Sequence, residues 1–335
     1  MKSKKDVIIG ETKGILSVQA TSQAIAEAML NISGNSEGIA ISVAFASSFS
    51  AGSLTLMGYE NQGVIETGQQ KDSIKGIASG GASAVAVASA TATAVAIAND
   101  TASATAISSA AAVAQAIADI TVVGIDNLGK IDTGEGKDIV TGEASAFAVA
   151  ETFTQSLALA FASTNNNGEA TALANAVASA TAQATAITIG IKDGEFRLGS
   201  GDDVVNATAT GDGVNIGIRN AVIYGGKGDD SVNVVATGGG VNLGIQEVLI
   251  YGDQGDDTFN LQNGTGNIYG GKGEDLLILK GHFADYKFYD TDHTFGVHIT
   301  NTDNGTDLFV REVENFQFTE DLSITYAYTN LHGIG

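Results

Sequence analysis

The sequence contains no cysteine, no proline and no tryptophan among its 335 residues, and aromatic residues make up only 6%. Without cysteine, the chain can form neither a disulfide framework nor a thiolate metal or redox site. With so few large side chains and 43 glycines, a core built on bulky residues is disfavoured. Ala and Val are the main contributors to the 44% hydrophobic share, which favours a repetitive fold with thin layers.

Positive charge is also scarce, because 16 basic residues stand against 38 acidic ones, for a net charge of −22. Such a chain should repel nucleic acid and anionic membrane surfaces and attract cations, although an acidic balance can also serve solubility alone. The basic start at 1–6 leads into a stretch too short and polar for a signal-peptide core. No run of about 18 apolar residues predicts a membrane span.

One short pattern recurs along the chain, most fully in its second half. Its four fullest copies are LGSGDDVV from Leu198, GGKGDDSV from Gly225, GDQGDDTF from Gly252 and GGKGEDLL from Gly270. Looser copies are TGEGKDIV from Thr133 and TGQQKDSI from Thr67, and a vestigial one from Ile9 has Gly14 in place of the aspartate. The aspartates at the sixth position are spaced by 66, 65, 27, 27 and 18 residues, and the last three spacings are multiples of nine.

This pattern resembles the GGxGxDxUx nonapeptide of the RTX (repeats-in-toxin) family of calcium-binding β-rolls. Glycine tolerates positive φ, so such loops can turn backbone carbonyls toward a hard cation, and a short carboxylate completes the oxygen ligands. The resemblance implies Ca²⁺ sites shared between successive coils, and a row of metal-free Asp-Gly turns is the alternative. The implied ligand residues are Asp72, Asp138, Gly199, Gly201, Asp203, Gly226, Gly228, Asp230, Asp253, Gly255, Asp257, Gly271, Gly273 and Asp275.

The first half of the chain alternates strictly with a period of two. Ala occupies every even position at 82–98 and again at 170–186, while Thr, Val and Ile are common at odd positions. This period predicts strands of about 20 residues, roughly 65 Å long, with an Ala-rich helix as the rival. We expect turns near 34–38, 99–100 and 165–168, an interior lined by the even face, and an exposed odd face that includes Phe147.

The predicted fold is an all-β, tapered parallel β-solenoid. Wide Ala-rich coils are expected over 1–197, narrow calcium-binding coils over 198–280, and a C-terminal β cap over 281–335. The last segment, with its phrase VENFQF from Val313, resembles the end of many RTX solenoids, which implies an uncleaved signal for type I secretion. The expected location is therefore extracellular or at the cell surface.

Catalytic motifs are weak. Residues 34–38 match G-x-S-x-G formally, but they lie at a predicted hairpin tip without a following helix. The four histidines, at 282, 293, 298 and 332, lack zinc-site spacing, and there is no phosphate-binding loop. We therefore predict that the protein is not an enzyme.

The expected function is that of a secreted calcium-binding structural protein. It would self-associate in an extracellular matrix, surface layer or fibre, through an N-terminal wide coil that is left open. Its expected partners are calcium ions and copies of itself, without nucleic acid and without a membrane span. The alternatives are an ice- or surface-binding solenoid, suggested by Thr91, Thr93, Thr101 and Thr105, and a repeat module of an RTX toxin or exoenzyme.

Overall fold

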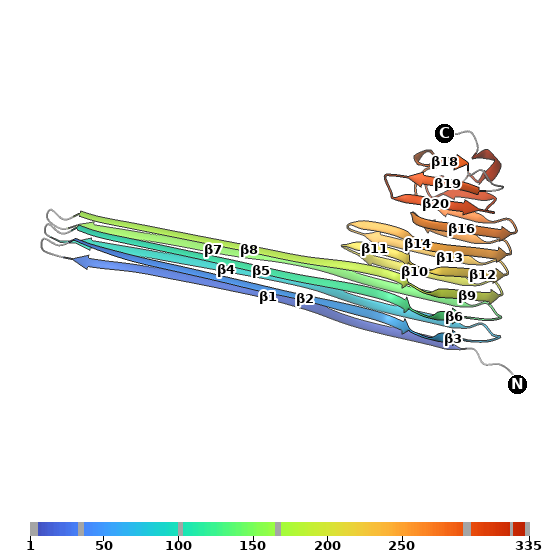
Figure 1. Cartoon of the computed structure of the whole chain (residues 1–335), viewed down its shortest axis with the longest axis horizontal. Coiled ribbons are helices and arrows are strands. Elements are labelled where there is room, and N and C mark those ends of the chain that lie inside the picture. The colour runs from blue at the N-terminus through green and yellow to red at the C-terminus, as the bar shows by residue number, and fades with distance from the viewer. Residues whose placement is uncertain are drawn as a thin grey trace.

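A computed structural model describes residues 6–32, 37–99, 103–164, 169–290, 296–321 and 324–331. The chain is almost entirely β-strand, and its long parallel sheets wrap around one axis, so the predicted parallel β-solenoid is confirmed. A long, thin blade of three coils carries a stack of much shorter coils at one end (Figure 1). No helix in the described residues is long and apolar enough to cross a membrane.

The blade consists of three coils that each run out along one strand and back along another. The outward strands are β1 (Val7–Ile32), β4 (Ser73–Ala98) and β7 (Ile139–Thr164). The return strands are β2 (Glu37–Asn61), β5 (Ser103–Asn127) and β8 (Glu169–Lys192). Each return strand is followed by a bend and a short strand that leads into the next loop, namely β3 (Val64–Glu66), β6 (Lys130–Asp132) and β9 (Glu195–Ser200).

The register of these strands follows the repeat. Val7 pairs with Ser73, Ser73 with Ile139, and Ile139 with Val204, so that successive coils superimpose at offsets of about 66 residues. The alternating Ala segments are strands, which rules out the rival helix. The strands are longer than expected, at 24–26 residues, because pairing continues beyond the Ala-rich stretch toward the loop corner. At about 3.3 Å per residue, the blade is therefore on the order of 80 Å long.

The interior of the blade is lined by the even-numbered face, as predicted. Ala82 to Ala98 in β4 and Ala110 to Ala118 in β5 are at most 1% exposed at their even positions. Odd positions face outward, and Phe147 remains 46% exposed. Small side chains on both inner faces let two sheets approach closely along their full length. Of the expected turns, 34–36, 100 and 165–168 lie outside the described residues.

A waist of glycines crosses the blade near its loop end, where the backbones of the two sheets touch. Gly10, Gly76 and Gly142 are in register in one sheet, and Gly58, Gly124 and Gly190 face them from the other. A Cβ at Gly76 would lie 2.1 Å from the carbonyl oxygen of Gly124, and one at Gly124 would lie 2.4 Å from the Glu143 amide nitrogen. These glycines are required for contact between sheets and not for a special φ.

Short coils continue both sheets above the blade. Their strands are β10 (Val204–Gly211), β11 (Val214–Arg219), β12 (Val222–Lys227), β13 (Ser231–Gly238), β14 (Val241–Gln254), β15 (Thr258–Gln262), β16 (Gly264–Lys272) and β17 (Leu276–Leu279). Their core contains larger side chains than the blade, such as the fully buried Phe259 and Leu261.

The described C-terminal part changes from parallel to antiparallel pairing. Its elements are a 3-10 turn (Phe283–Asp285), β18 (Lys287–Asp290), β19 (Gly296–Asn301), β20 (Thr306–Arg311), β21 (Asn315–Phe318), β22 (Tyr326–Ala327) and a second 3-10 turn (Tyr328–Asn330). Strands β18, β19 and β20 pair antiparallel, while β20 and β21 still continue the two parallel sheets. Phe283 stacks on Tyr326 and covers Phe318.

We predict that Gly124→Ala destabilises the protein by about 1–3 kcal/mol, because the added methyl group would have to displace backbone atoms of the opposite sheet. Gly63→Ala is the matched control, since a Cβ there meets nothing within 4 Å. Urea unfolding followed by circular dichroism measures both. Equal stability of the two variants would show that the waist is not tightly packed.

Candidate functional site

The aspartates of the repeat form one continuous ladder of hydrogen bonds at the loop corner. The backbone N–H of each aspartate donates to Oδ1 of the aspartate in the next coil. The N–H to Oδ1 distances are 2.7 Å for Asp72 to Asp138, 2.6 Å for Asp138 to Asp203, 2.8 Å for Asp203 to Asp230, 2.8 Å for Asp230 to Asp257 and 2.8 Å for Asp257 to Asp275. All six side chains are at most 3% exposed. The structure thus brings together every predicted aspartate of the sixth position.

The ladder has two further members that sequence reasoning missed. The Asp6 N–H donates to Asp72 at 2.7 Å, and the Asp275 N–H donates to Oε2 of Glu314 at 3.0 Å. The assignment of Gly14 to the aspartate position of the first coil is therefore wrong, because Gly14 pairs with Gly80 inside the blade. The missed signal is an Asp four residues before a waist glycine, in the phrases DVIIG, DSIKG and DIVTG that begin at 6, 72 and 138.

The predicted loop glycines stack in two columns beside the ladder. One column contains Gly199, Gly226, Asp253 and Gly271, and the other contains Gly201, Gly228, Gly255 and Gly273. All eight residues have positive φ, including Asp253 at 74°. A Cβ at Gly228 would lie 2.0 Å from the Gly201 carbonyl oxygen, so each loop rests directly on the loop below. Here glycine supplies both the backbone conformation and the close approach.

The acidic residue before each ladder aspartate forms an outer ladder at the surface. The Asp229 N–H donates to Asp202, the Asp256 N–H to Asp229 at 2.9 Å, and the Glu274 N–H to Asp256 at 2.9 Å. These bonds point from the upper coil to the lower one, whereas those of the inner ladder point upward. Each pair of adjacent acidic residues therefore forms hydrogen bonds with the coil above and with the coil below. Lys137 also pairs with Asp202 at the lower end of the outer ladder.

The second carboxylate oxygen of each inner aspartate is buried without a hydrogen-bond partner. This holds for Oδ2 of Asp72, Asp138, Asp203, Asp230, Asp257 and Asp275. Burial raises the pKa of Asp203 to about 7, that of Asp230 to about 8, that of Asp257 to about 6 and that of Asp275 to about 7, and neighbouring carboxylates add to the shift. A stack of buried, negatively charged oxygens is unstable unless protons or a cation compensate the charge.

The loops that contain these aspartates have carboxylates and stacked glycine carbonyls, which are hard oxygen ligands. In the upper coils Oδ2 points at the first glycine of its own loop, since a Cβ at Gly225, Gly252 or Gly270 would lie 2.1–2.4 Å from it. Carboxylate and glycine carbonyl oxygens are ligands of Ca²⁺ type. Among the described residues, no three His, Cys, Asp or Glu side chains are grouped to hold a metal. Backbone carbonyls would therefore have to supply most ligands of a cation here.

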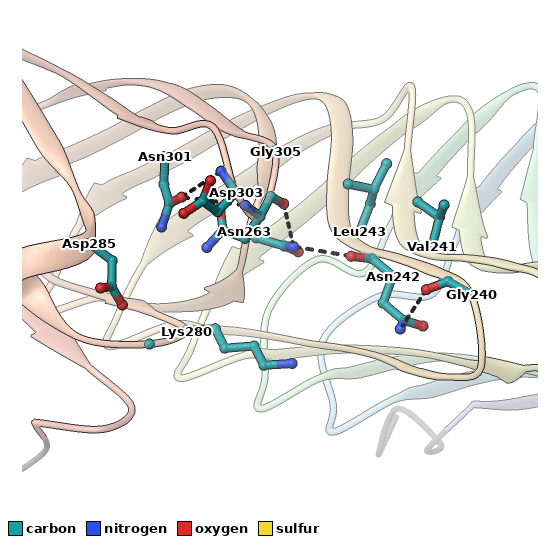
Figure 2. Close-up of a pocket in the computed structure, with 12 residues that line it drawn as sticks. Gly240, Val241, Asn242, Leu243, Asn263, Lys280, Asp285, Asn301, Asp303 and Gly305 are labelled. Atoms are coloured by element: carbon teal, nitrogen blue, oxygen red, sulfur yellow. Dashed lines mark hydrogen bonds between the residues drawn. The ribbon is translucent and has the colours of Figure 1, made fainter.

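A cleft with a volume of about 730 Å³ lies between the short coils and the hairpin formed by β19 and β20 (Figure 2). Several of its asparagine side chains hydrogen-bond to backbone groups of the lining. Asn263 donates to the carbonyls of Asn242 and Asn304, and Oδ1 of Asn301 accepts the N–H of Asp303. This cleft is a hydrogen-bonded joint between the coils and the hairpin.

The described histidines lie near the surface of the C-terminal part. His282 pairs with Asp321 at 3.1 Å, and His298 pairs with Asp307 at 2.6 Å while stacking on Phe309. His293, His332 and residues 34–36 of the G-x-S-x-G match lie outside the described residues. Neither described histidine is brought together with the aspartate ladder.

No protein-family model matches this sequence, and a search of curated proteins finds no matching relative. The class that the structure defines is therefore a structural one: a parallel β-solenoid with a ladder of buried aspartates along one corner.

Without calcium, we predict that the protein is more stable at pH 5.5 than at pH 8.5. The raised pKa values mean that the folded state retains protons that the unfolded chain, with carboxyl pKa values near 4, has already lost. This stabilisation is complete below about pH 4 and is lost as the pH rises through 6–8. Thermal unfolding in a chelator at both pH values measures it. Greater stability at pH 8.5 would contradict the prediction.

Proposed function

We propose that this protein is a secreted, calcium-dependent structural protein that assembles with copies of itself outside the cell. The observation that carries the calcium assignment is the row of buried Oδ2 atoms without hydrogen-bond partners. Above pH 8 these atoms need a cation, and the loops around them offer only oxygen ligands. The likeness of the loop sequences to RTX nonapeptides supports the same assignment, and with it export by type I secretion.

Self-association is supported by the outermost strands of the blade. Within the described part of the chain, β1 and β2 each pair on one side only, with β4 and β5 respectively. Strands of 25 and 26 residues thus present long rows of free backbone donors and acceptors. Apolar side chains such as Ile41, Val43 and Phe45 are 66–74% exposed beside this edge. Such an edge is a template for another β-strand.

The ice-binding alternative receives less support. Thr91 and Thr93 face outward in β4, but their register neighbours are Ile25 and Leu157 for Thr91, and Glu27 and Leu159 for Thr93. Thr105 pairs with Thr171 on one side but with Ile39 on the other, and Thr101 lies outside the described residues. The described threonines of this set therefore do not form a regular array across all three coils. For the enzyme or toxin module, no catalytic grouping emerges from the described residues that would favour it over assembly.

We predict opposite effects of Asp230→Asn with and without calcium. The amide keeps the Oδ1 acceptor but removes the buried charge, so the variant should be more stable than the natural protein in a chelator at pH 8.5. In calcium it should lose on the order of 2–3 kcal/mol of ligand stabilisation, the amount expected at a hundredfold excess over Kd. Thermal unfolding in the two buffers measures both effects.

Asp229→Asn is the matched control, because it removes the same charge from the adjacent, exposed outer ladder. It should change the calcium response far less. If Asp230→Asn and the natural protein gained the same stability from calcium, the inner ladder would not be the metal site.

We further predict that the protein forms assemblies in calcium whose size grows with concentration. When the β1 and β2 edge of one copy joins a different surface of the next, the product is open and does not stop at a dimer. Sedimentation velocity over a hundredfold concentration range and electron microscopy would reveal it. A monomer throughout that range would refute self-association while leaving the calcium assignment intact.

A further inference from the structure

A step exists where the wide coils give way to the short ones. Strand β10 pairs with β7 only over Ile139–Ala146, and β11 pairs with β8 only over Ile187–Lys192. Residues 147–164 of β7 and 169–186 of β8 therefore have a free upper edge in the described structure, 18 residues long in each strand (Figure 1). At about 3.3 Å per residue this edge extends for roughly 60 Å.

Exposure of the inward face shows that the step is uncovered. Ala84 to Ala96 in β4 are at most 1% exposed at their even positions, because β7 lies above them. Their register partners in β7, from Ala150 to Ala162, are exposed although they have the same inward orientation. The side chains uncovered at this second open edge are therefore those that point into the core of the blade.

We propose that this step is the surface on which the β1 and β2 edge of a second copy is seated, so that one contact uses both open edges. The inference rests on the proposed self-association and names its receiving surface. The second copy would extend both sheets of the first, with β1 against β7 and β2 against β8, in the parallel sense that the solenoid uses throughout.

The stagger of the two sheets favours this partner over a step-to-step pair. β1 packs against both β2 and β5, and β4 packs against both β5 and β8, so the sheets are offset by about half a strand spacing. β7 therefore stands above β8 at the step, whereas β2 lies below β1 at the other edge. A second copy that is moved by translation alone therefore fits its β1 and β2 edge onto the step. Two steps facing each other by a two-fold rotation would bring β7 against β7 but leave the β8 strands apart.

Charge permits the contact despite the net charge of −22. Glu151 is the only charged residue of 147–164, and Glu169 is the only one of 169–186. Over 7–24 of β1, Glu11 and Lys13 form an ion pair at 2.9 Å. Repulsion between copies is therefore weakest where these edges would meet.

The short coils determine the register of the contact. Because β10 covers 139–146 of β7, and the loop corner of the second copy extends past its own Val7, the second copy must be shifted by more than eight residues toward the tip of the blade. An even shift keeps the Ala positions inward. Repeated shifts of this kind build a staircase filament.

The test uses one charge at each edge. Ser156→Lys and Ser50→Lys each put a lysine on the inward face, at the step and on β2 respectively, where an added strand would bury it. Each variant alone should remain monomeric in calcium at concentrations at which the natural protein assembles. An equimolar mixture should form a 1:1 heterodimer, because each variant keeps the edge that the other has lost. Sedimentation equilibrium measures all three samples.

The matched controls are Gln155→Lys and Ala51→Lys, which place the same charge on the outward face one residue away. Both should assemble like the natural protein, whereas the two inward variants should raise the concentration needed for assembly at least tenfold. Thr154→Lys, also inward at the step, replaces Ser156→Lys if that variant does not fold by circular dichroism.

Three results would overturn the inference. Assembly of Ser156→Lys at the concentrations at which the natural protein assembles would show that the step is not a contact surface. A homodimer of Ser50→Lys would indicate step-to-step pairing, and a mixture that stays monomeric would show that the two edges do not meet. Each of these leaves self-association of the natural protein standing, whereas a natural protein that is monomeric would remove the proposed function as well.

Discussion

The coils of this solenoid close at the same corner, where from Asp72 to Asp275 a buried aspartate accepts the N–H of the aspartate in the coil below. Coils of 66, 65, 27 and 18 residues all share this one contact geometry. The length of a coil can therefore vary widely, because only the corner has to repeat. The unpaired second oxygens are the cost of this arrangement, since a ladder of buried carboxylates requires compensation by protons or by a cation.

The blade and the short coils solve the packing problem in different ways. Ala-lined sheets bury little apolar area per residue, and the blade compensates by extending 24–26 residue strands through three coils. The short coils instead bury Ile250, Phe259 and Leu277 between their sheets. The sheets can touch at the glycine waist and separate beyond it, which allows a thin blade and a thicker stack to share one pair of sheets.

The change from long to short coils leaves an additional strand edge open for assembly. A solenoid whose coils all had one length would expose edges only at its two ends, whereas this one also exposes the upper edge of its third coil. The natural cover for a long parallel edge is another strand of the same length and hydrophobic pattern. The chain itself contains such strands in β1 and β2, which links its unusual shape to self-association.

The sequence alone determined the class of fold and the members of the ladder from Asp72 to Asp275, and it favoured the even-numbered face as the inward face of the blade. Those features have strict periods of two or of whole coils, so local patterns were sufficient to predict them. The end members Asp6 and Glu314 were not predicted from the sequence. A ladder position is defined by its neighbour in space, and neither residue follows the Gly-rich phrase of the repeat. Only the tertiary structure decided which hydrogen bonds the carboxylates make, which oxygens remain unpaired and where strands end without a neighbour. These properties depend on how residues from different coils superimpose, and no single repeat contains that information.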